Sequence, residues 1–364
     1  MMKRNLHTRV LTVAMITQMI VSTSLYAGNG KIAKSTMIID WKTIQSLKSL
    51  GQSPLSRGLA GAFSGRIGKH LYIIGGANFD KAYPWEGGKK RWYREILRYG
   101  LSSDRWNCCE ETLPGELAYG ASIQLRDGFL CIGGCNKTAC SDLVFYLTMD
   151  NDRIVVDSTR FPRLPVKLAN MAATKIKNCI YILGGQTSMT DDASTNLFYC
   201  LDLNNPKAGW QQLPSWPGPS RGYAVCAGQG RSLYLFSGRS YSGNQPTTMH
   251  EDGYVFDTRK QTWRRLKGHF PVMAGTAIAQ GEKLVFLGGV EQLLPTTPNH
   301  PGFSRLVRVY DTRKEAFDPP ILSPYPLSVT TNTVVIGNTF YIMSGEIQPG
   351  IRTPEIITGT LKRK

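Results

Sequence analysis

The chain has 364 residues, of which 41% are hydrophobic and 19% are charged, with 37 glycines and 20 prolines. This composition indicates a folded protein rich in turns, and it excludes an intrinsically disordered chain, a collagen and a coiled coil. The formal net charge of +17 allows a nucleic acid, an anionic surface or an acidic small molecule as partner, and charge alone does not choose among them.

Residues 1–27 have the features of a secretory signal peptide. An apolar stretch over residues 10–21 is preceded by three basic side chains, Lys3, Arg4 and Arg9, and residues 25–27 offer a cleavage site. A membrane anchor is the alternative, but polar residues interrupt this stretch, which is also shorter than the ~20 apolar residues of a membrane span. We therefore expect residues 28–364 to be one periplasmic domain, without a membrane partner once the signal is removed.

A repeated apolar run organises the rest of the chain. The six runs share an ending in two small residues and are LYIIGG (71–76), FLCIGG (129–134), IYILGG (180–185), LYLFSG (233–238), LVFLGG (284–289) and FYIMSG (340–345). Their last residues are 58, 51, 53, 51 and 56 positions apart. A period near 50 is typical of kelch repeats, in which each repeat forms one four-stranded blade of a β-propeller.

The segments around each run supply the other strands of a blade. A segment of small residues precedes every run, as in LAGAFSGRI (59–67), and predicts the innermost strand, where side chains crowd around the axis. The outermost strand usually carries an aromatic residue, namely Trp106, Trp210, Trp263 or Phe317. The sixth repeat lacks this strand, and residues 37–47 have its pattern. The sequence thus predicts an all-β, six-bladed propeller whose N-terminal strand completes the last blade and closes the ring.

Strand direction predicts which loops meet. Strands within a blade are antiparallel, so the loops after the small pairs and the loops before the inner strands open on one face. Polar residues of the first group are Asn78, Gln186, Arg239, Glu291 and Glu346, and those of the second are Arg57, Glu116 and Arg221. Long loops on a rigid scaffold often carry function. We therefore expect Arg57, Asn78, Arg221, Arg239 and Glu291 to bind a substrate at this mouth.

The densest polar motif is residues 344–353, SGEIQPGIRT. Glu346 leaves the second strand of its blade directly, and a Pro-Gly turn brings Arg352 back six residues later. Arginine can hold a carboxylate with two parallel hydrogen bonds, and a glutamate can move a proton. The alternative is an ion pair that only fixes the loop. Spacing alone leaves both interpretations open.

Residues 77–92 interleave aromatic and basic side chains, as in Tyr83-Pro84-Trp85 and Lys89-Lys90-Arg91-Trp92. Such a surface suits a sugar or a nucleic acid, and predicted export argues against nucleic acid. A folded lid whose tryptophans pack on the blade is the competing interpretation.

Cysteine and histidine spacing predicts no metal site. All eight cysteines lie between Cys108 and Cys226, and Cys135 and Cys140 flank a short loop as candidates for a disulfide. The pairing among the eight stays open.

The motifs now resemble those of one family. The repeats together with GGANF (75–79), PWEGGKK (84–90), LYLFSGR (233–239) and SGE..PG.RT (344–353) are similar to the bacterial N-acetylneuraminate epimerase, or sialic acid mutarotase, family, and to its cyclically permuted branch in particular. In unpermuted members the SGE..PG.RT segment lies in a middle blade. Permutation leaves a closed ring intact.

The resemblance implies a soluble, exported isomerase that interconverts the α and β anomers of N-acetylneuraminate without a cofactor. It implies that Glu346 is the proton acceptor and that Arg352 is the accompanying arginine. Two other classes of function remain as alternatives. One is a non-catalytic kelch propeller that binds a glycan or a protein, and the other is a glycoside hydrolase, for which the sequence offers no convincing catalytic pair.

Overall fold

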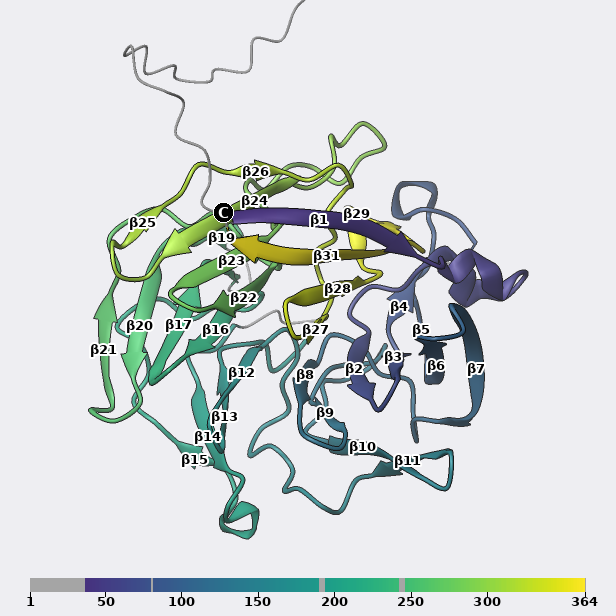
Figure 1. The fold of residues 1–364 in the computed structure, drawn as a ribbon, viewed down its shortest axis with the longest axis horizontal. Helices are drawn as coiled ribbons and strands as arrows, with labels where there is room; N and C mark the ends of the chain where they lie inside the picture. The colour runs from purple at the N-terminus through teal and green to yellow at the C-terminus, as the bar shows by residue number, and fades with distance from the viewer. Residues whose placement is uncertain (1–36, 80, 190–193, 242–245, 364) are drawn as a thin grey trace, which may run out of the picture. The chain divides into compact units, whose positions relative to one another are not determined.

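The computed structural model describes residues 37–79, 81–189, 194–241 and 246–363. These residues form 31 strands and four short 3-10 helices, and they contain no α-helix. Six sheets, each of four or more strands, are arranged as the blades of a six-bladed β-propeller (Figure 1), which confirms the predicted fold. The predicted signal peptide lies outside the described residues. Within those residues no helix has the length and apolarity that a membrane crossing requires.

Each blade is an antiparallel sheet, and its strands are named in order from the centre of the propeller outward. Blade 1 is β2 (Phe63–Ile67), β3 (His70–Ile74), β6 (Glu95–Gly100) and β7 (Arg105–Thr112), and blade 2 is β8 (Ala121–Gln124), β9 (Phe129–Ile132), β10 (Val144–Asp150) and β11 (Arg153–Asp157). Blade 3 is β12 (Ala172–Ile176), β13 (Cys179–Leu183), β14 (Phe198–Asp202) and β15 (Gln211–Gln212), and blade 4 is β16 (Val225–Gln229), β17 (Ser232–Phe236), β20 (Gly253–Asp257) and β21 (Thr262–Arg265). Blade 5 is β22 (Thr276–Gln280), β23 (Lys283–Leu287), β24 (Leu306–Asp311) and β25 (Ala316–Phe317), with β26 (Ile321–Leu322) also paired to β24.

Blade 6 joins the two ends of the propeller. Its strands are β27 (Thr333–Ile336), β28 (Thr339–Met343), β31 (Ile356–Arg363) and β1 (Met37–Ile44). Strand β1 pairs antiparallel with β31 along its whole length, and Figure 1 shows the purple β1 beside the yellow β31. The predicted closure by the N-terminal strand is therefore confirmed.

The loops between the blade strands contain short hairpins and 3-10 helices. The hairpins are β4 (Ala77–Asn78) with β5 (Arg91–Trp92), β18 (Arg239–Ser240) with β19 (Thr248–Met249), and β29 (Glu346–Gln348) with β30 (Ile351–Arg352). The 3-10 helices are η1 (Leu47–Leu50), η2 (Pro54–Arg57), η3 (Pro84–Glu86) and η4 (Pro206–Ala208).

The outer tryptophans join neighbouring blades. The indole N–H of Trp106 donates to the Gln45 carbonyl at 2.7 Å, that of Trp210 to Pro162 at 3.1 Å, and that of Trp263 to Pro214 at 2.8 Å. Each acceptor belongs to the connection that leaves the preceding blade. The aromatic residues seen in the repeat thus fasten one blade to the next through a polar tip on an apolar ring.

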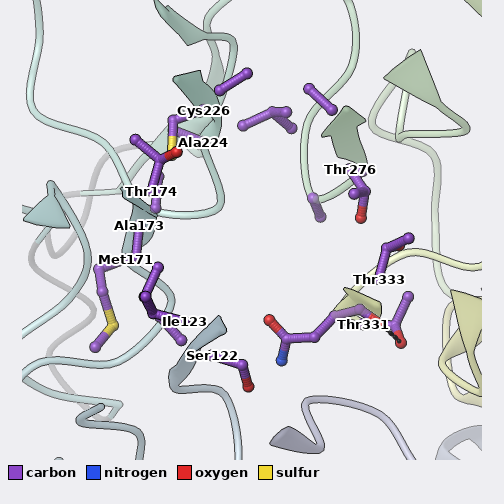
Figure 2. Close-up of a pocket in the computed structure, with 18 of the residues that line it drawn as sticks. Ser122, Ile123, Met171, Ala173, Thr174, Ala224, Cys226, Thr276, Thr331 and Thr333 are labelled. Carbon is purple, nitrogen blue, oxygen red and sulfur yellow. Dashed lines mark hydrogen bonds between the residues drawn. The ribbon is translucent and has the colours of Figure 1, made fainter. Parts of the chain in front are cut away.

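The inner strands surround an open channel of about 530 Å³. All six blades contribute to its wall, which is mostly alanine, glycine, serine and threonine. Figure 2 shows Ser122, Thr174, Thr276 and Thr333 around the open space. The small residues predicted beside the axis therefore leave a channel rather than a filled core.

A closed ring of backbone hydrogen bonds encircles one end of this channel. One residue per blade takes part, just before each inner strand, and each N–H donates to the carbonyl of the preceding member at 2.7–2.9 Å: Gly61, Tyr119, Asn170, Tyr223, Ala274 and Thr330. All six have positive φ, between 47° and 65°. We call these six residues the axial ring.

Closure of the ring is testable on β1, whose side chains alternate between two faces. Ile39 is 8% exposed and packs in the core between blades 5 and 6, whereas its neighbour Ile38 is 42% exposed. We expect Ile39→Ala to lower the free energy of unfolding by about 2–5 kcal/mol, because it leaves a cavity between strands. Ile38→Ala should change it by less than about 0.5 kcal/mol. Urea denaturation of both variants measures the difference, and equal effects would contradict the role of β1 in the core.

Candidate active site

The hairpin formed by β29 and β30 brings Glu346 opposite Arg352. It begins at Gly345, whose φ of 111° is unfavourable for other residues. A Cβ there would also lie 2.7 Å from the Cβ of Ser328. The buried Ser344 hydroxyl donates to the Thr353 carbonyl at 2.6 Å and accepts from the Leu59 N–H at 2.9 Å. The base of the hairpin is therefore fixed to blades 1 and 6.

The Glu346 carboxylate has three partners. Its Oε1 accepts the Gly350 N–H at 2.7 Å and lies 3.1 Å from Arg352 Nη1, and its Oε2 accepts the Thr330 hydroxyl at 3.3 Å. The side chain keeps 15% of its surface exposed. Glu346 and Arg352 thus form the ion pair that the alternative interpretation of this motif predicted. The Glu346 carboxylate nevertheless remains partly exposed.

Arg352 is the more deeply buried partner, with 2% of its side chain exposed. Burial lowers the pKa of Arg352, but the charge of Glu346 and the contact with Tyr119 together raise it by more, so the pKa lies above its usual value. Nη2 donates to the Tyr119 hydroxyl at 3.4 Å, and the guanidinium lies 4.8 Å from the centre of the Phe79 ring. Within the described part of the chain, the buried Nε has no hydrogen-bond partner, and Nη1 has the Glu346 carboxylate as its ion-pair partner. Buried N–H groups of this kind are costly unless a ligand or water pairs with them.

Both residues line a cavity of about 420 Å³, a volume usual for small-molecule sites. Its charged lining residues are Lys90, Arg239, Glu346 and Arg352, three cations against one anion. The guanidinium of Arg239 lies over the Tyr223 ring at 4.5 Å. The cavity is therefore suited to a ligand with a net negative charge.

His300 adds a neutral polar group to this wall. Burial lowers the pKa of His300, and its Nδ1 accepts the Gly302 N–H at 3.0 Å. The ring proton therefore sits on Nε2. Three hydrogen bonds tie the loop of His300 to the Glu346 hairpin: Gln348 Nε2 to the carbonyls of Thr297 and Pro298, at 3.1 and 3.3 Å, and Phe303 N–H to the Ile347 carbonyl, at 3.0 Å.

The structure brings Glu346, Arg352 and Arg239 together and places the other predicted binding residues elsewhere. Arg221 is fully buried and pairs with Asp252 at 2.6 Å. Asn78 is also buried, and its amide donates to the Gly58 carbonyl at 2.6 Å. Glu291 pairs with Arg308 at 2.6 Å outside the cavity lining. We therefore withdraw Arg221, Asn78 and Glu291 as direct ligand contacts.

Arg57 lines a neighbouring hollow of about 540 Å³. This hollow shares Phe79, Gly350 and Arg352 with the cavity, so Arg57 lies on the far side of the wall that Arg352 forms. Gln186 is buried and accepts from Asn170, and Glu116 lines a separate hollow.

A shift of one position along the chain explains why some of these side chains face the cavity and others do not. Residues directly after the small pairs, such as Arg239 and Glu346, form single β-bridges with Gly222 and Val329 and face the cavity. Asn78 and Glu291 come one position later, and Arg221 one position before its bridged neighbour. Successive side chains of extended chain point to opposite sides, so these three point away.

Sequence analysis missed Tyr119 and Tyr223, which line the cavity from the axial ring. Both are large aromatic residues in segments otherwise made of small ones, and this contrast was the available signal. Lys90 belongs to the aromatic and basic segment that the sequence suggested for sugar binding, and it lines the cavity over the Phe79, Trp92 and Tyr119 rings at 5.0–5.8 Å.

The segment 77–92 lines the cavity through Phe79, Pro84 and Lys90. Tyr83 stacks on Trp85 with ring centres 5.0 Å apart, and a Cβ added at Gly350 would lie 2.6 Å from Pro84. The segment therefore packs against the Glu346 hairpin.

The eight cysteines are all free thiols, including Cys135 and Cys140, which face each other across a β-bridge. Among the described residues, no three His, Cys, Asp or Glu side chains are grouped closely enough to hold a metal ion.

Comparison with known proteins decides the family. The model of the N-acetylneuraminate epimerase family matches residues 23–156 and 161–297, which together are more than half of the chain. The chain belongs to the N-acetylneuraminate epimerase family. The matched segments end before Glu346 and Arg352, so the family match does not itself include the hairpin.

Curated relatives carry the same family name. The chain is 24% identical to an N-acetylneuraminate epimerase of Vibrio vulnificus over 255 residues, which cover 61% of this chain and 63% of the relative. It is 27% identical to one of Brucella melitensis over 235 residues, which cover 55% and 59%. The match thus spans less than two thirds of the length of these N-acetylneuraminate epimerases.

The buried Arg221–Asp252 pair gives a prediction about stability. Burial raises the pKa of Asp252, but the hydrogen bonds and charge of Arg221, together with Tyr254 and His250, lower it by more, so the pKa lies below its usual value. The pair therefore stabilises the protein above about pH 4, the pKa of an unfolded Asp, and this contribution is lost as the pH falls through the lower, folded value. We expect Asp252→Asn to destabilise the protein by roughly 3 kcal/mol at pH 7, because Arg221 stays buried without a counter-charge.

Glu111→Gln is the matched control, since Glu111 pairs with Arg153 on the surface. It should cost at most about 1 kcal/mol. Denaturation at pH 7 and near pH 3.5 measures both variants. Stability of Asp252→Asn that equals wild type at pH 7 would contradict the structural role of the pair.

Proposed function

We propose that the protein is a mutarotase that interconverts the α and β anomers of an acidic keto sugar, N-acetylneuraminate being the substrate that the family name suggests. One observation carries the proposal. A partly exposed carboxylate and a buried guanidinium, whose Nε–H has no partner among the described residues, line the same cavity of about 420 Å³. An isomerase-type activity agrees with the names of the family and of its curated relatives.

Arg352 and Arg239 hold the carboxylate of the sugar in this proposal. The Nε–H of Arg352 has no hydrogen-bond partner among the described residues and offers a charge-assisted donor to this anion. Arg239 adds a second positive charge on the same wall. The excess of cations keeps the site attractive to an anion although Glu346 is itself negative.

Glu346 acts as the base. It takes the proton of the anomeric hydroxyl, the anomeric carbon becomes a carbonyl, and the bond to the ring oxygen breaks. The open-chain sugar then recloses on the other face of the carbonyl. The Gly350 N–H and the Thr330 hydroxyl hold the carboxylate in place, and a positioned base contributes roughly 10²–10⁴-fold to such a rate.

We also propose that residues 1–27 direct the protein to the periplasm. The basic start and apolar middle of this segment support the proposal, and it lies outside the described residues. In the same scheme the mature protein is soluble and needs no cofactor.

Anomer exchange tests the function. The α anomer of N-acetylneuraminate, freshly released by a sialidase, is followed by proton NMR with wild-type protein and with Glu346→Gln. We expect the wild type to accelerate exchange and the variant to lose roughly 10²–10⁴-fold of that acceleration, because an amide cannot accept the proton.

Glu315→Gln serves as control, since Glu315 pairs with Arg264 on the outer edge of the propeller, and it should match wild type. Sugar binding without any acceleration would instead favour the non-catalytic glycan-binding propeller. Release of sugar from a sialylated conjugate would favour a glycoside hydrolase.

A further inference from the structure

We propose that Tyr119 is the acid of the reaction and gives its phenolic proton to the ring oxygen of the sugar. This inference rests on the proposed function, which names a base but leaves the ring oxygen without a proton donor. Tyr119 lies in the second repeat, far in sequence from the Glu346 hairpin, and it lines the same cavity.

One guanidinium connects the base to the phenol. Arg352 Nη1 lies 3.1 Å from Glu346 Oε1, and Arg352 Nη2 donates to the Tyr119 hydroxyl at 3.4 Å. Because the phenol oxygen accepts this bond, its own proton remains available to another acceptor. The hydrogen bond is long, as such contacts often are before a substrate binds. The proposed base and the proposed acid thus contact the same guanidinium.

The backbone holds Tyr119 in place at some cost. Its φ of 61° is rare for an aromatic residue. Its N–H donates to the Gly61 carbonyl at 2.7 Å, and its carbonyl accepts the Asn170 N–H at 2.8 Å. A Cβ at Gly61 would lie 2.5 Å from the Tyr119 ring, so the glycine leaves the space that the ring uses. Unfavourable conformations that the fold enforces are frequent at functional sites.

Two cations lie beside Tyr119. Lys90 Nζ lies 5.0 Å from the centre of its ring, and Arg352 contacts its oxygen. When Glu346 takes the anomeric proton, the carboxylate becomes neutral and Arg352 loses its negative partner. The phenolate formed in the same step replaces that partner. The net charge of the three side chains is therefore unchanged through the reaction, which avoids an uncompensated charge inside the cavity.

The step balances. The anomeric O–H proton goes to Glu346, and the electrons of that bond form the carbonyl. The electron pair of the bond between the anomeric carbon and the ring oxygen goes to the ring oxygen, which takes the Tyr119 proton. On reclosure the hydroxyl returns its proton to the phenolate and the carbonyl oxygen takes the proton from Glu346, so both side chains are restored.

Tyr119→Phe tests the proposal with the full-length protein and N-acetylneuraminate. We expect kcat for anomer exchange to fall roughly 10²–10⁴-fold. The affinity for the methyl glycoside of the sugar, which cannot open, should change by less than about threefold, because the variant keeps the ring and the cations. Proton donors in the buffer, such as imidazolium at constant pH, should raise the rate of the variant above the protein-free rate, whereas a merely structural role would give no such rescue.

Tyr310→Phe is the matched control, because the buried Tyr310 hydroxyl has no hydrogen-bond partner among the described residues, and it should match wild type. A Tyr119→Phe protein that melts like wild type and retains its kcat would overturn this inference while wild-type activity and the loss in Glu346→Gln still supported the proposed function. Absence of acceleration by the wild type would overturn both proposals.

Discussion

The axial ring is the constraint on which the propeller and its cavity both depend. Six residues, one from each blade, donate backbone hydrogen bonds to one another in a closed circle. Each adopts positive φ to do so, an arrangement that costs free energy at every position except glycine. The circle fixes where the inner strands start and therefore how the loops above them meet. Glu346 enters the cavity through its bridge to Val329, the residue just before the ring member Thr330.

The cavity joins segments that are far apart in sequence. Tyr119 and Tyr223 come from the axial ring, Lys90 from the loop of blade 1, His300 from the loop of blade 5, and Glu346 with Arg352 from blade 6. Its cations outnumber its one anion, Glu346, and the Nε–H of Arg352 is left without a partner in the described chain. Buried polar groups in a folded protein are usually satisfied, so this incomplete set indicates that the cavity is made to receive an anion.

Sequence patterns could predict the architecture because it depends on periodicity. The spacing of the apolar runs gave six blades, and the missing outer strand in the last repeat led directly to the pairing of β1 with β31. The SGE..PG.RT segment likewise predicted that Glu346 and Arg352 would converge, and they lie opposite each other in a hairpin.

The finer parts of the site depend on details that periodicity does not contain. Arg221 has the charge expected of a ligand contact, yet its side chain is fully buried and forms an ion pair with Asp252. Asn78 and Glu291 differ from cavity-facing positions by a single residue, and such a shift reverses the direction of a side chain. Tyr119 reaches Arg352 only because its backbone adopts a conformation that its residue type does not favour.

The pairing of β1 with β31 has a consequence for synthesis on the ribosome. Strand β1 is synthesised before blades 1–5, and its partner β31 is synthesised after them. Until then its edge is unpaired and the nascent ring stays open. The Glu346 hairpin lies between β28 and β31, so the last blade to be translated both closes the ring and supplies the carboxylate and guanidinium. A nascent chain interrupted before this blade would therefore lack the site as well as the closure.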